Sequence, residues 1–379
     1  MIIREIEAKS ILLKHRKIDS WFISRYGMNL YRGCAHNCVY CDGRSERYQV
    51  DGLFGENVTI KANAVDVLRR ELDPERKRTQ LKPSYIMLGG GVGDSYQRVE
   101  KKYQLTRRTL DLLYEFRWPV HVLTKSTLVE RDIDILREIN QRSGAIVSFS
   151  ISSVNDEISS IFEPNVPSPS KRLSTLAIFK KQGIACGIFL LPVIPFITDT
   201  PELIEETVRK AHEVGVDFIV FGGMTLKEGR QKDYFFELLK EKYPKLLAEY
   251  RSIYKGNKWG QAEREYYNSI NQIFNQAAKK YRMPKRVPLS LYKNILWEND
   301  LVIVILEHID YLLKLEGRHS SYGYAAFMIS RLDKPLSTMK RELRKIKGVG
   351  ENTEKTILEI LETKSSSYYE ELLTSDILC

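Results

Sequence analysis

No long hydrophobic run occurs in this chain of 379 residues. The longest apolar candidate, residues 184–197, is too short to span a membrane and contains Pro192 and Pro195. The first ten residues, MIIREIEAKS, mix charged with apolar side chains and do not form the apolar core of a secretory signal. The sequence therefore predicts a cytoplasmic protein without a membrane partner.

Cysteine is also scarce: the five cysteines are an odd number, which does not suit a disulfide framework. Three of them, Cys34, Cys38 and Cys41, fall within eight residues. In a reducing compartment, such clustering indicates metal ligation rather than disulfide bonding. The other two, Cys186 and Cys379, are isolated in the sequence.

Acidic residues are outnumbered, with 49 Asp and Glu against 59 Lys and Arg, and the net charge is +10. A positive excess favours a polyanionic partner such as nucleic acid. Because many proteins without such a partner are mildly basic, charge alone raises this expectation only modestly.

Short β-rich runs alternate with amphipathic helical patterns between residues 28 and 221. We expect strands at 85–88, 120–123, 145–150, 184–190 and 217–221. We expect helices at 105–116, 133–140, 173–182 and 202–214. This order predicts an α/β fold with a parallel sheet, whose chemistry gathers beyond the carboxyl ends of its strands.

The pattern changes after residue 256. Residues 256–286 are polar, basic and rich in tyrosine, and they predict an exposed helix with a linker. From Trp297 onward the pattern is helical without strands. The sequence thus predicts an α/β domain at 1–255, with a sheet that is either open or closed into a barrel, a polar helical linker at 256–295 and an all-α domain at 296–379.

The three clustered cysteines lie in the run RGCAHNCVYC, with CxxxCxxC spacing. Three thiolates on one short loop can bind three irons of a four-iron cluster and leave the fourth iron open to a substrate. The alternative is a zinc site with His36 as its fourth ligand. This alternative fits less well, because His36 lies inside the loop that it would have to close.

With the aromatic Tyr40 before the last cysteine, this spacing resembles the radical S-adenosylmethionine superfamily. Further stretches resemble its branch of DNA-repair photolyases related to spore photoproduct lyase: MNLYRGCAHNCVYC, GDSYQRVEKKYQLTRRTLDLL, VHVLTKSTLVERDIDIL, EPNVPSPSKRL and GIFLLPVIPFITD. The resemblance implies a partial (β/α)6 barrel of the TIM type, with a 4Fe-4S cluster bound by the three cysteines at its C-terminal mouth. It also implies that the cluster, reduced by an external donor such as flavodoxin or ferredoxin, cleaves S-adenosylmethionine to a 5′-deoxyadenosyl radical.

The resemblance further implies a set of cofactor-binding residues. They are Tyr40, Gly89, Gly90, Gly91, Lys125, Ser150, Ser152, Arg172 and Ile194. Glycines let backbone approach a ligand closely, Lys125 and Arg172 are candidates to bind a carboxylate, the serines to bind the ribose and Ile194 to pack on adenine. Each also has a structural interpretation: a flexible turn, a solvated cation or ordinary barrel wall.

The residue that would return a hydrogen atom is harder to assign. Spore photoproduct lyase uses a cysteine not far beyond the cluster motif, whereas no cysteine lies between Cys41 and Cys186 here. This departure weighs against the spore-photoproduct reaction itself. The candidates are Cys186 and Tyr96, although Cys186 begins a predicted strand and is more simply interpreted as a buried structural thiol.

The run RKIKGVGENTEKTILEI at 344–360 resembles a helix–hairpin–helix, and with LEHIDYLLKLEGR it resembles the N-terminal domain of family X DNA polymerases. The predicted nucleic-acid-binding residues are Lys345, Lys347, Gly348 and Gly350, where backbone amides at a helix N-terminus favour a phosphate. Thr356 occupies the position of that family's lyase lysine, so we do not carry lyase activity over. The alternative is that the glycines only cap a helix in a protein-docking domain.

The sequence as a whole favours a radical enzyme, lyase-like, that repairs or processes a damaged or modified nucleotide in DNA. We expect its helical domain to hold the phosphate backbone near the barrel mouth. One alternative is radical modification of RNA, a small molecule or a peptide. The other is a non-catalytic nucleic-acid-binding protein with a structural metal site.

Overall fold

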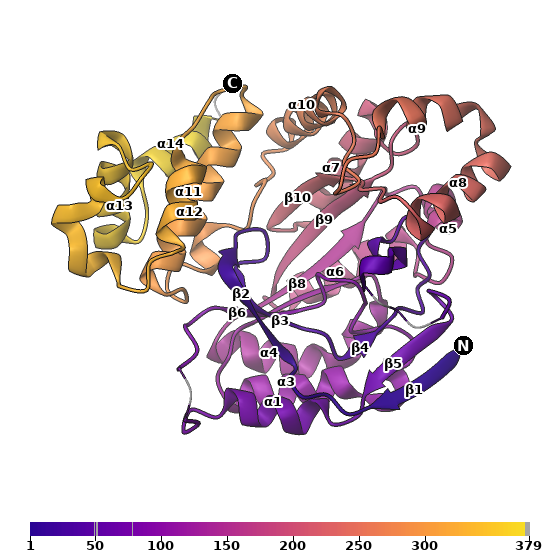
Figure 1. Ribbon diagram of the computed structural model, residues 1–379, viewed down its shortest axis with the longest axis horizontal. Helices are drawn as coiled ribbons and strands as arrows, with labels where there is room; N and C mark the ends of the chain where they lie inside the picture. The colour runs from indigo at the N-terminus through magenta and orange to yellow at the C-terminus, as the bar shows by residue number, and fades with distance from the viewer. Residues whose placement is uncertain (49, 51, 78, 376–379) are drawn as a thin grey trace.

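A curled sheet forms the centre of the protein in this computed structural model, which describes residues 1–48, 50, 52–77 and 79–375 (Figure 1). Its strands run in the order β10-β9-β8-β7-β6-β3-β2. Their bounds are β2 Leu12–Asp19, β3 Ser24–Met28, β6 Tyr85–Leu88, β7 Val120–Thr124, β8 Ala145–Ile151, β9 Ala185–Val193 and β10 Phe218–Gly223. Within the described residues, six of these strands are parallel and only β2 runs antiparallel. Because β2 and β10 are the two edges, the predicted partial barrel with six parallel strands is confirmed.

Helices return the chain from each strand to the next, as expected. They are α1 Ala64–Leu72, α3 Leu105–Glu115, α4 Ile133–Arg142, α6 Pro169–Lys181 and α7 Pro201–Val214. Local sequence sets where they begin: the side chain of Ser168 caps α6 and that of Thr200 caps α7, each followed by proline at the first helical position. Their buried apolar faces pack on the outer face of the sheet and form the main core.

A second, smaller sheet and several short helices lie around the carboxyl ends of the parallel strands, and the sequence did not predict them. The small sheet has the order β1-β5-β4, with bounds β1 Ile2–Ile6, β5 Asn57–Lys61 and β4 Tyr31–Arg32. The short helices are η1 Asp42–Arg44, η2 Glu46–Tyr48, α2 Glu100–Tyr103, η3 Thr127–Asp132, α5 Asp156–Phe162, α8 Arg230–Lys242, η4 Pro244–Leu246 and α9 Leu247–Ile253. These elements surround the mouth of the half-barrel.

The helix expected in the polar region after residue 256 is α10, Arg264–Lys280, and it is not exposed on all sides. Ile270 and Phe274 are buried in the main core, and the Phe274 ring stacks on Phe221 of β10 at 4.4 Å between centroids. The expectation of an exposed helix was therefore wrong, because a buried stripe of apolar residues pins α10 to the barrel.

The rest of the chain is helical, as predicted. After η5 Leu289–Leu291 come α11 Glu298–Leu315, α12 Tyr322–Ile329, η6 Leu336–Lys345, α13 Glu351–Thr363 and α14 Ser367–Ser375. Cys379 lies outside the described residues. Within the described part of the chain, no helix has both the length and the hydropathy to cross a bilayer.

This helical unit packs against the amino ends of the parallel strands. The buried guanidinium of Arg25, at the start of β3, forms an ion pair with Asp300 of α11. The Tyr85 hydroxyl, at the start of β6, donates to the Leu291 carbonyl at 2.8 Å. The expected placement near the barrel mouth was therefore wrong: the contacts hold the helices at the opposite end of the sheet, and Figure 1 shows them at the far side from α5 and α8.

Candidate active site

The cysteine loop between β4 and η1 lies over the carboxyl ends of the parallel strands. Cys34 and Cys38 are buried, and Cys41 is half-buried. Three other segments hold the loop: the Gln97 side chain bonds the Gly33 carbonyl at 3.1 Å, the Val39 amide donates to Phe162, and Gln231 donates to the Tyr40 carbonyl. The loop is therefore fixed before any metal binds.

The three thiols lie close enough to influence one another. Burial raises the pKa of the Cys34 thiol well above its usual range, and the charges of Asp94, Cys38 and Cys41 add to this shift. Yet in the described residues no three His, Cys, Asp or Glu side chains converge on a single metal ion. Cysteine thiols are the donors that iron–sulfur clusters take.

His36 does not complete a zinc site either. Its Nε2 lies 3.1 Å from Asp94 Oδ2, and its Nδ1 lies 3.3 Å from the Asn165 carbonyl oxygen. Asp94 in turn accepts from the Thr124 hydroxyl and the Lys125 amide, both at 2.7 Å. Burial acts to raise the pKa of Asp94, but His36 and these donors lower it overall. Asp94 therefore ties the cysteine loop to the end of β7.

Lys125, at the end of β7, is the centre of a polar network at the mouth. Its Nζ donates to Ser150 Oγ at 2.7 Å, to Glu163 Oε1 at 2.9 Å and to the Tyr40 hydroxyl at 3.0 Å. The Tyr40 hydroxyl also donates to Glu163. The structure thus brings together three residues that the sequence predicted at this site: Lys125, Ser150 and Tyr40.

Glu163 is a site residue that the sequence analysis missed. It is buried, and Arg172 binds its second carboxylate oxygen. Burial acts to raise the pKa of Glu163, but Arg172 and Lys125 hold it well below its usual range. The one sequence signal for Glu163 was Arg172, nine positions away, because a buried arginine needs an acidic partner.

Arg172 was expected to bind a carboxylate of the cofactor, and that expectation needs correction. It is fully buried and binds the protein's own carboxylate, Glu163, together with the Ser150 carbonyl at 2.7 Å. It therefore acts on the site through Glu163 rather than by direct contact.

Ser152 differs from its neighbour Ser150. The Ser150 hydroxyl donates to the Leu191 carbonyl at 2.8 Å. The Ser152 hydroxyl is buried just beyond β8 and has no hydrogen-bond partner among the described residues. An unpaired buried hydroxyl costs free energy unless a ligand satisfies it, so Ser152 fits a ligand contact.

The glycine run after β6 has two kinds of position. Gly89 has φ +88°, and a Cβ there would lie 2.0 Å from the Leu123 carbonyl oxygen, so its backbone demands glycine; Gly90 is also in the left-handed region. Gly91 is neither left-handed nor crowded. Neither the backbone conformation nor packing requires a glycine at Gly91, so contact with a ligand would explain the glycine there.

Ile194 follows β9 and is fully buried in an apolar cluster with Cys38 and Tyr40. Its backbone amide donates a hydrogen bond to the Thr198 hydroxyl oxygen at 2.7 Å. The structure therefore places Ile194 beside the cysteine loop, as an adenine-packing role requires.

The two candidates for hydrogen return lie at different ends of the sheet: Cys186 at the amino end of β9, and Tyr96 in the loop after the carboxyl end of β6. Cys186 is buried at the amino end of β9, where its Sγ lies 3.4 Å from the Ile184 carbonyl oxygen. Tyr96 is fully buried, and its hydroxyl faces Asp132. The structure therefore contradicts a catalytic role for Cys186, whereas the role of Tyr96 stays a prediction.

The hairpin of the C-terminal unit joins η6 to α13. Gly348 has φ +86°, and the exposed Gly350 is the N-cap of α13. Lys345 forms an ion pair with Glu342 at 2.9 Å, whereas the exposed Lys347 pairs with no described residue. Lys347 is therefore the more available cation for a phosphate.

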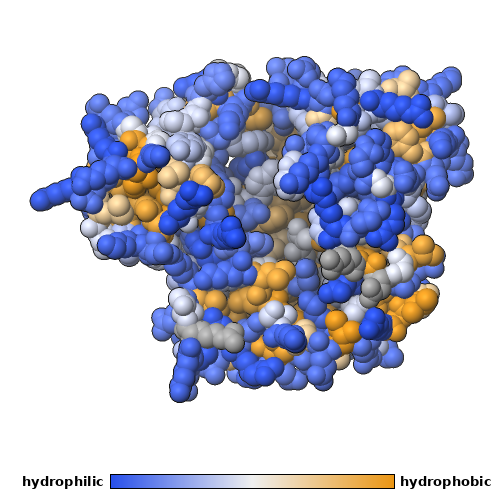
Figure 2. All heavy atoms as spheres, in the orientation of Figure 1, coloured by the Kyte–Doolittle hydropathy of each residue, from blue (hydrophilic) through white to orange (hydrophobic). Residues whose placement is uncertain are grey.

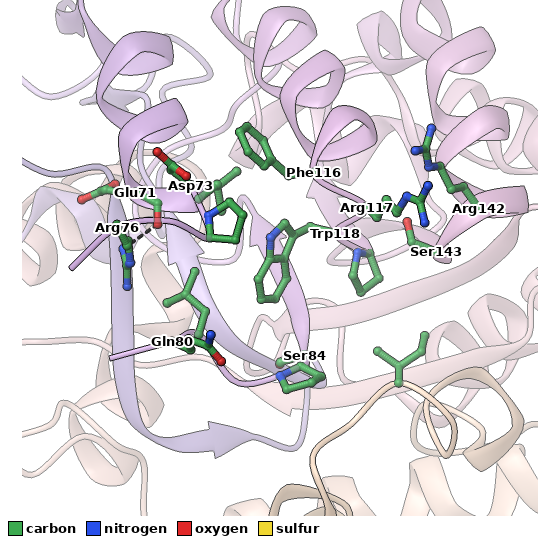
Figure 3. A pocket seen from close by; sticks show the side chains of 16 residues that line it. Glu71, Asp73, Arg76, Gln80, Ser84, Phe116, Arg117, Trp118, Arg142 and Ser143 are labelled. Atoms are coloured by element: carbon green, nitrogen blue, oxygen red, sulfur yellow. Dashed lines mark hydrogen bonds between the residues drawn. The ribbon is translucent and has the colours of Figure 1, made fainter. Parts of the chain in front are cut away.

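A hollow of about 580 Å³ also opens near the amino ends of β6 and β7. In Figure 3, Arg117 and Arg142 lie on one side of Trp118 and Arg76 lies on the other. None of the predicted cofactor residues lines this hollow, so it is separate from the mouth.

Two family models match the chain. Residues 28–200 match the radical SAM superfamily, and residues 297–366 match a helix-hairpin-helix domain. Among curated proteins, an uncharacterized protein of Methanocaldococcus jannaschii is 30% identical over 222 residues, covering 58% of this chain and 77% of that protein. An uncharacterized protein of Mycobacterium tuberculosis is 30% identical over 235 residues, covering 61% of this chain and 67% of that protein.

Solved structures show a similar fold. Spore photoproduct lyase complexed with dinucleoside spore photoproduct superposes with a TM-score of 0.54 at 16% identity, over 75% of this chain and 81% of that one. A mutant of spore photoproduct lyase gives the same values. At this identity the likeness concerns the fold alone.

Proposed function

This chain belongs to the radical SAM superfamily, and we propose that it binds a 4Fe-4S cluster through Cys34, Cys38 and Cys41 and acts on DNA. The observation that carries the proposal is the prepared loop at the mouth of the half-barrel, with its three mutually close thiols. When bound, the cluster and S-adenosylmethionine supply one-electron cleavage of a carbon–sulfur bond and a 5′-deoxyadenosyl radical. The protein's own residues position these groups and exclude water.

Three residues, with Tyr40 beside them, would contact S-adenosylmethionine directly in this proposal. Gly91 offers uncrowded backbone, Ser152 offers an unpaired hydroxyl, and Ile194 offers apolar surface beside Tyr40. These groups come from the ends of β6, β8 and β9 and from the cysteine loop. They therefore surround one space at the carboxyl edge of the sheet.

Lys125 would supply charge to that space. Lys125 and Arg172 together share the single carboxylate of Glu163, which leaves one positive charge uncompensated in the network. A buried excess cation favours an anionic group such as the carboxylate of S-adenosylmethionine or a substrate phosphate.

DNA is the substrate class that the C-terminal unit supports best. The helix-hairpin-helix match, the exposed Gly350 and the unpaired Lys347 suit a phosphate backbone. The likeness in fold to a lyase that was solved with a dinucleoside photoproduct agrees with this class. We propose repair or processing of a damaged or modified nucleotide, and not the spore-photoproduct reaction, because Cys186 does not reach the mouth.

Reconstitution tests the radical chemistry. The protein, loaded with iron and sulfide under anaerobic conditions and reduced with dithionite, should convert S-adenosylmethionine to 5′-deoxyadenosine. Cys38→Ala should abolish this conversion, whereas Cys186→Ala should retain it. A wild-type protein that binds zinc and gives no 5′-deoxyadenosine would overturn the proposal.

Substrate class needs a separate measurement. Ultraviolet-irradiated DNA, undamaged DNA and RNA should be compared in binding and in product formation with the loaded enzyme. We expect the irradiated or otherwise modified DNA to give a product and RNA to give none. Product formation on RNA alone would replace DNA by the RNA alternative.

A further inference from the structure

A second hollow, of about 600 Å³, lies directly behind the cysteine loop. Ala35 and His36, the residues that follow Cys34, form part of its wall. None of the residues that we assign to S-adenosylmethionine, Gly91, Ser152 and Ile194 among them, lines it. The hollow is therefore distinct from the cofactor space that we assign.

The charge around this hollow has one sign. Arg98 and Lys101 line it, and both are exposed and pair with no described residue. Among the described residues that line it, none is an aspartate or a glutamate. Two unpaired cations beside a neutral wall favour an acidic partner.

Exposed apolar side chains adjoin the same surface. Ile2 is 64% exposed and Leu53 is 67% exposed. Both bond Glu56, the neighbour of Gly55 in the wall of the hollow: the Ile2 amide donates to the Glu56 carbonyl at 2.7 Å, and the Glu56 amide donates to the Leu53 carbonyl at 3.1 Å. Figure 2 shows hydrophobic side chains gathered at this edge of the molecule, where Figure 1 places the N-terminus and β1. Apolar side chains next to unpaired cations are typical of a protein interface and are not needed to bind a phosphate backbone.

The Arg98 position is coupled to the cysteine loop by one residue. The side chain of Gln97 bonds the Gly33 carbonyl at 3.1 Å and the Ala35 amide at 2.9 Å. A partner held by Arg98 would thus sit against the backbone that carries Cys34. This is a short route from the surface to the metal site, and electron transfer slows steeply with distance.

We propose that this surface, formed by Ala35, His36, Arg98 and Lys101 with the flanking Ile2 and Leu53, docks an acidic one-electron-carrier protein. The inference rests on the proposed function, which requires an external electron. In the step, the reduced carrier loses one electron and the bound cluster gains one, with no bond made or broken. The placement leaves the barrel mouth and the distant hairpin free for the nucleic acid.

The test compares two reductants on one variant. Arg98→Glu/Lys101→Glu, in the loaded enzyme, should lose at least tenfold in the kcat/KM for flavodoxin-driven cleavage of S-adenosylmethionine, and should keep wild-type cleavage with dithionite. Binding of an acidic flavodoxin, measured by interferometry at low salt, should weaken by at least tenfold. Arg98→Lys/Lys101→Arg should retain the wild-type kcat/KM with flavodoxin and the wild-type flavodoxin binding, because it keeps both positive charges.

A matched control reverses two other unpaired charges. Arg137→Glu/Lys181→Glu changes the exposed Arg137 of α4 and Lys181 of α6 by the same charge and should leave flavodoxin binding unchanged. Equal loss in this control, or full flavodoxin binding in Arg98→Glu/Lys101→Glu, would overturn the docking site. Weakened oligonucleotide binding with intact flavodoxin binding would assign the hollow to nucleic acid instead. Failure of wild-type cleavage with dithionite would overturn the proposed function, while the binding measurement would still judge the docking surface.

Discussion

The ammonium group of Lys125 lies 2.9 Å from Oε1 of Glu163, although 38 positions separate the two residues in the chain. Arg172 binds the other oxygen of the same carboxylate. A buried acid between two cations thus underlies the candidate active site, and several predictions concern it.

Removing Glu163 alone should lower the free energy of unfolding more than removing Glu163 and Arg172 together. Glu163→Gln leaves Arg172 buried without a counter-charge, and we expect a loss of about 3–5 kcal/mol in the free energy of unfolding. Urea unfolding measures this loss. Glu163→Gln/Arg172→Met should lose less than the single variant, because the fully buried guanidinium is removed and only the half-buried Lys125 is left without its counter-charge. A loss below about 1 kcal/mol for Glu163→Gln would mean that solvent already screens the site.

Lys125→Gln should weaken cofactor binding while the protein stays folded, since Glu163 keeps its bond to Arg172. Loss of a hydrogen bond from a charged group corresponds to a rise of about tenfold or more in the Kd for S-adenosylmethionine. Equilibrium binding to the reconstituted protein measures it. Lys180→Gln, which breaks an ion pair with Asp217 away from the mouth, should leave the Kd unchanged; an unchanged Kd in Lys125→Gln as well would remove Lys125 from the site.

Ser152→Ala should separate binding from stability. Because the Ser152 hydroxyl is unpaired and buried, its removal should leave the free energy of unfolding unchanged or higher and weaken S-adenosylmethionine binding. Ser148→Ala is the converse control: the Ser148 hydroxyl is 2.8 Å from His121 Nε2, so its loss should cost about 1–3 kcal/mol of stability without changing the Kd. A large loss of stability in Ser152→Ala would contradict this role.

Stability should fall in mild acid because of His308. Burial lowers the pKa of His308 to about 3, whereas the pKa in the unfolded chain is about 6.5. Below about pH 6.5 the unfolded chain binds a proton that the folded protein excludes, so the contribution is complete above that pH and is lost as the pH falls. At pH 5 the loss is about 2 kcal/mol.

Urea unfolding at pH 7 and pH 5 checks this prediction. His308 joins α11 to the Ser20 carbonyl and the Tyr369 hydroxyl, each at 3.0 Å. His308→Gln can retain one of these bonds but does not titrate, so its stability should change less between the two pH values. An identical change in both proteins would assign the acid sensitivity to other groups.

The hairpin lysines should differ in their effect on DNA binding. Lys347→Ala should weaken binding to all sequences alike and reduce the slope of log K against log salt by about 1. Lys345→Ala should have a smaller effect, because Lys345 already pairs with Glu342. Fluorescence anisotropy over a salt series measures both. Equal effects would mean that DNA displaces Glu342 from Lys345.

Much of the fold followed from local pattern. The strand at Tyr85–Leu88 agrees with the expected bounds, and the other expected strands differ by a few residues at their ends. Alternation of short apolar runs with amphipathic helices admits few arrangements besides a parallel sheet. The small sheet of β1, β5 and β4 escaped prediction because its strands pair across distant segments and β4 has only two residues.

The candidate site likewise contains residues that the sequence predicted and residues that only the folded structure revealed. The three clustered cysteines could be identified because their type and spacing carry chemistry in a short segment, whereas Tyr40 and Lys125 were predicted from the resemblance. Glu163 could not, since only folding reveals that Lys125 and Arg172 converge on it. Cys186 was misassigned for the complementary reason: residue type alone does not say at which end of a strand a residue lies.

By itself, the sequence determined the half-barrel, the cysteine loop and a separate helical segment with a hairpin, because periodicity and motif spacing are local properties of the chain. Only the tertiary structure decided that this segment packs at the amino ends of the strands, far from the cysteine loop. That placement depends on buried contacts between distant residues, such as Arg25 with Asp300 and Ser20 with His308. Their free energy arises only when the chain has already folded, and no short run of sequence records it.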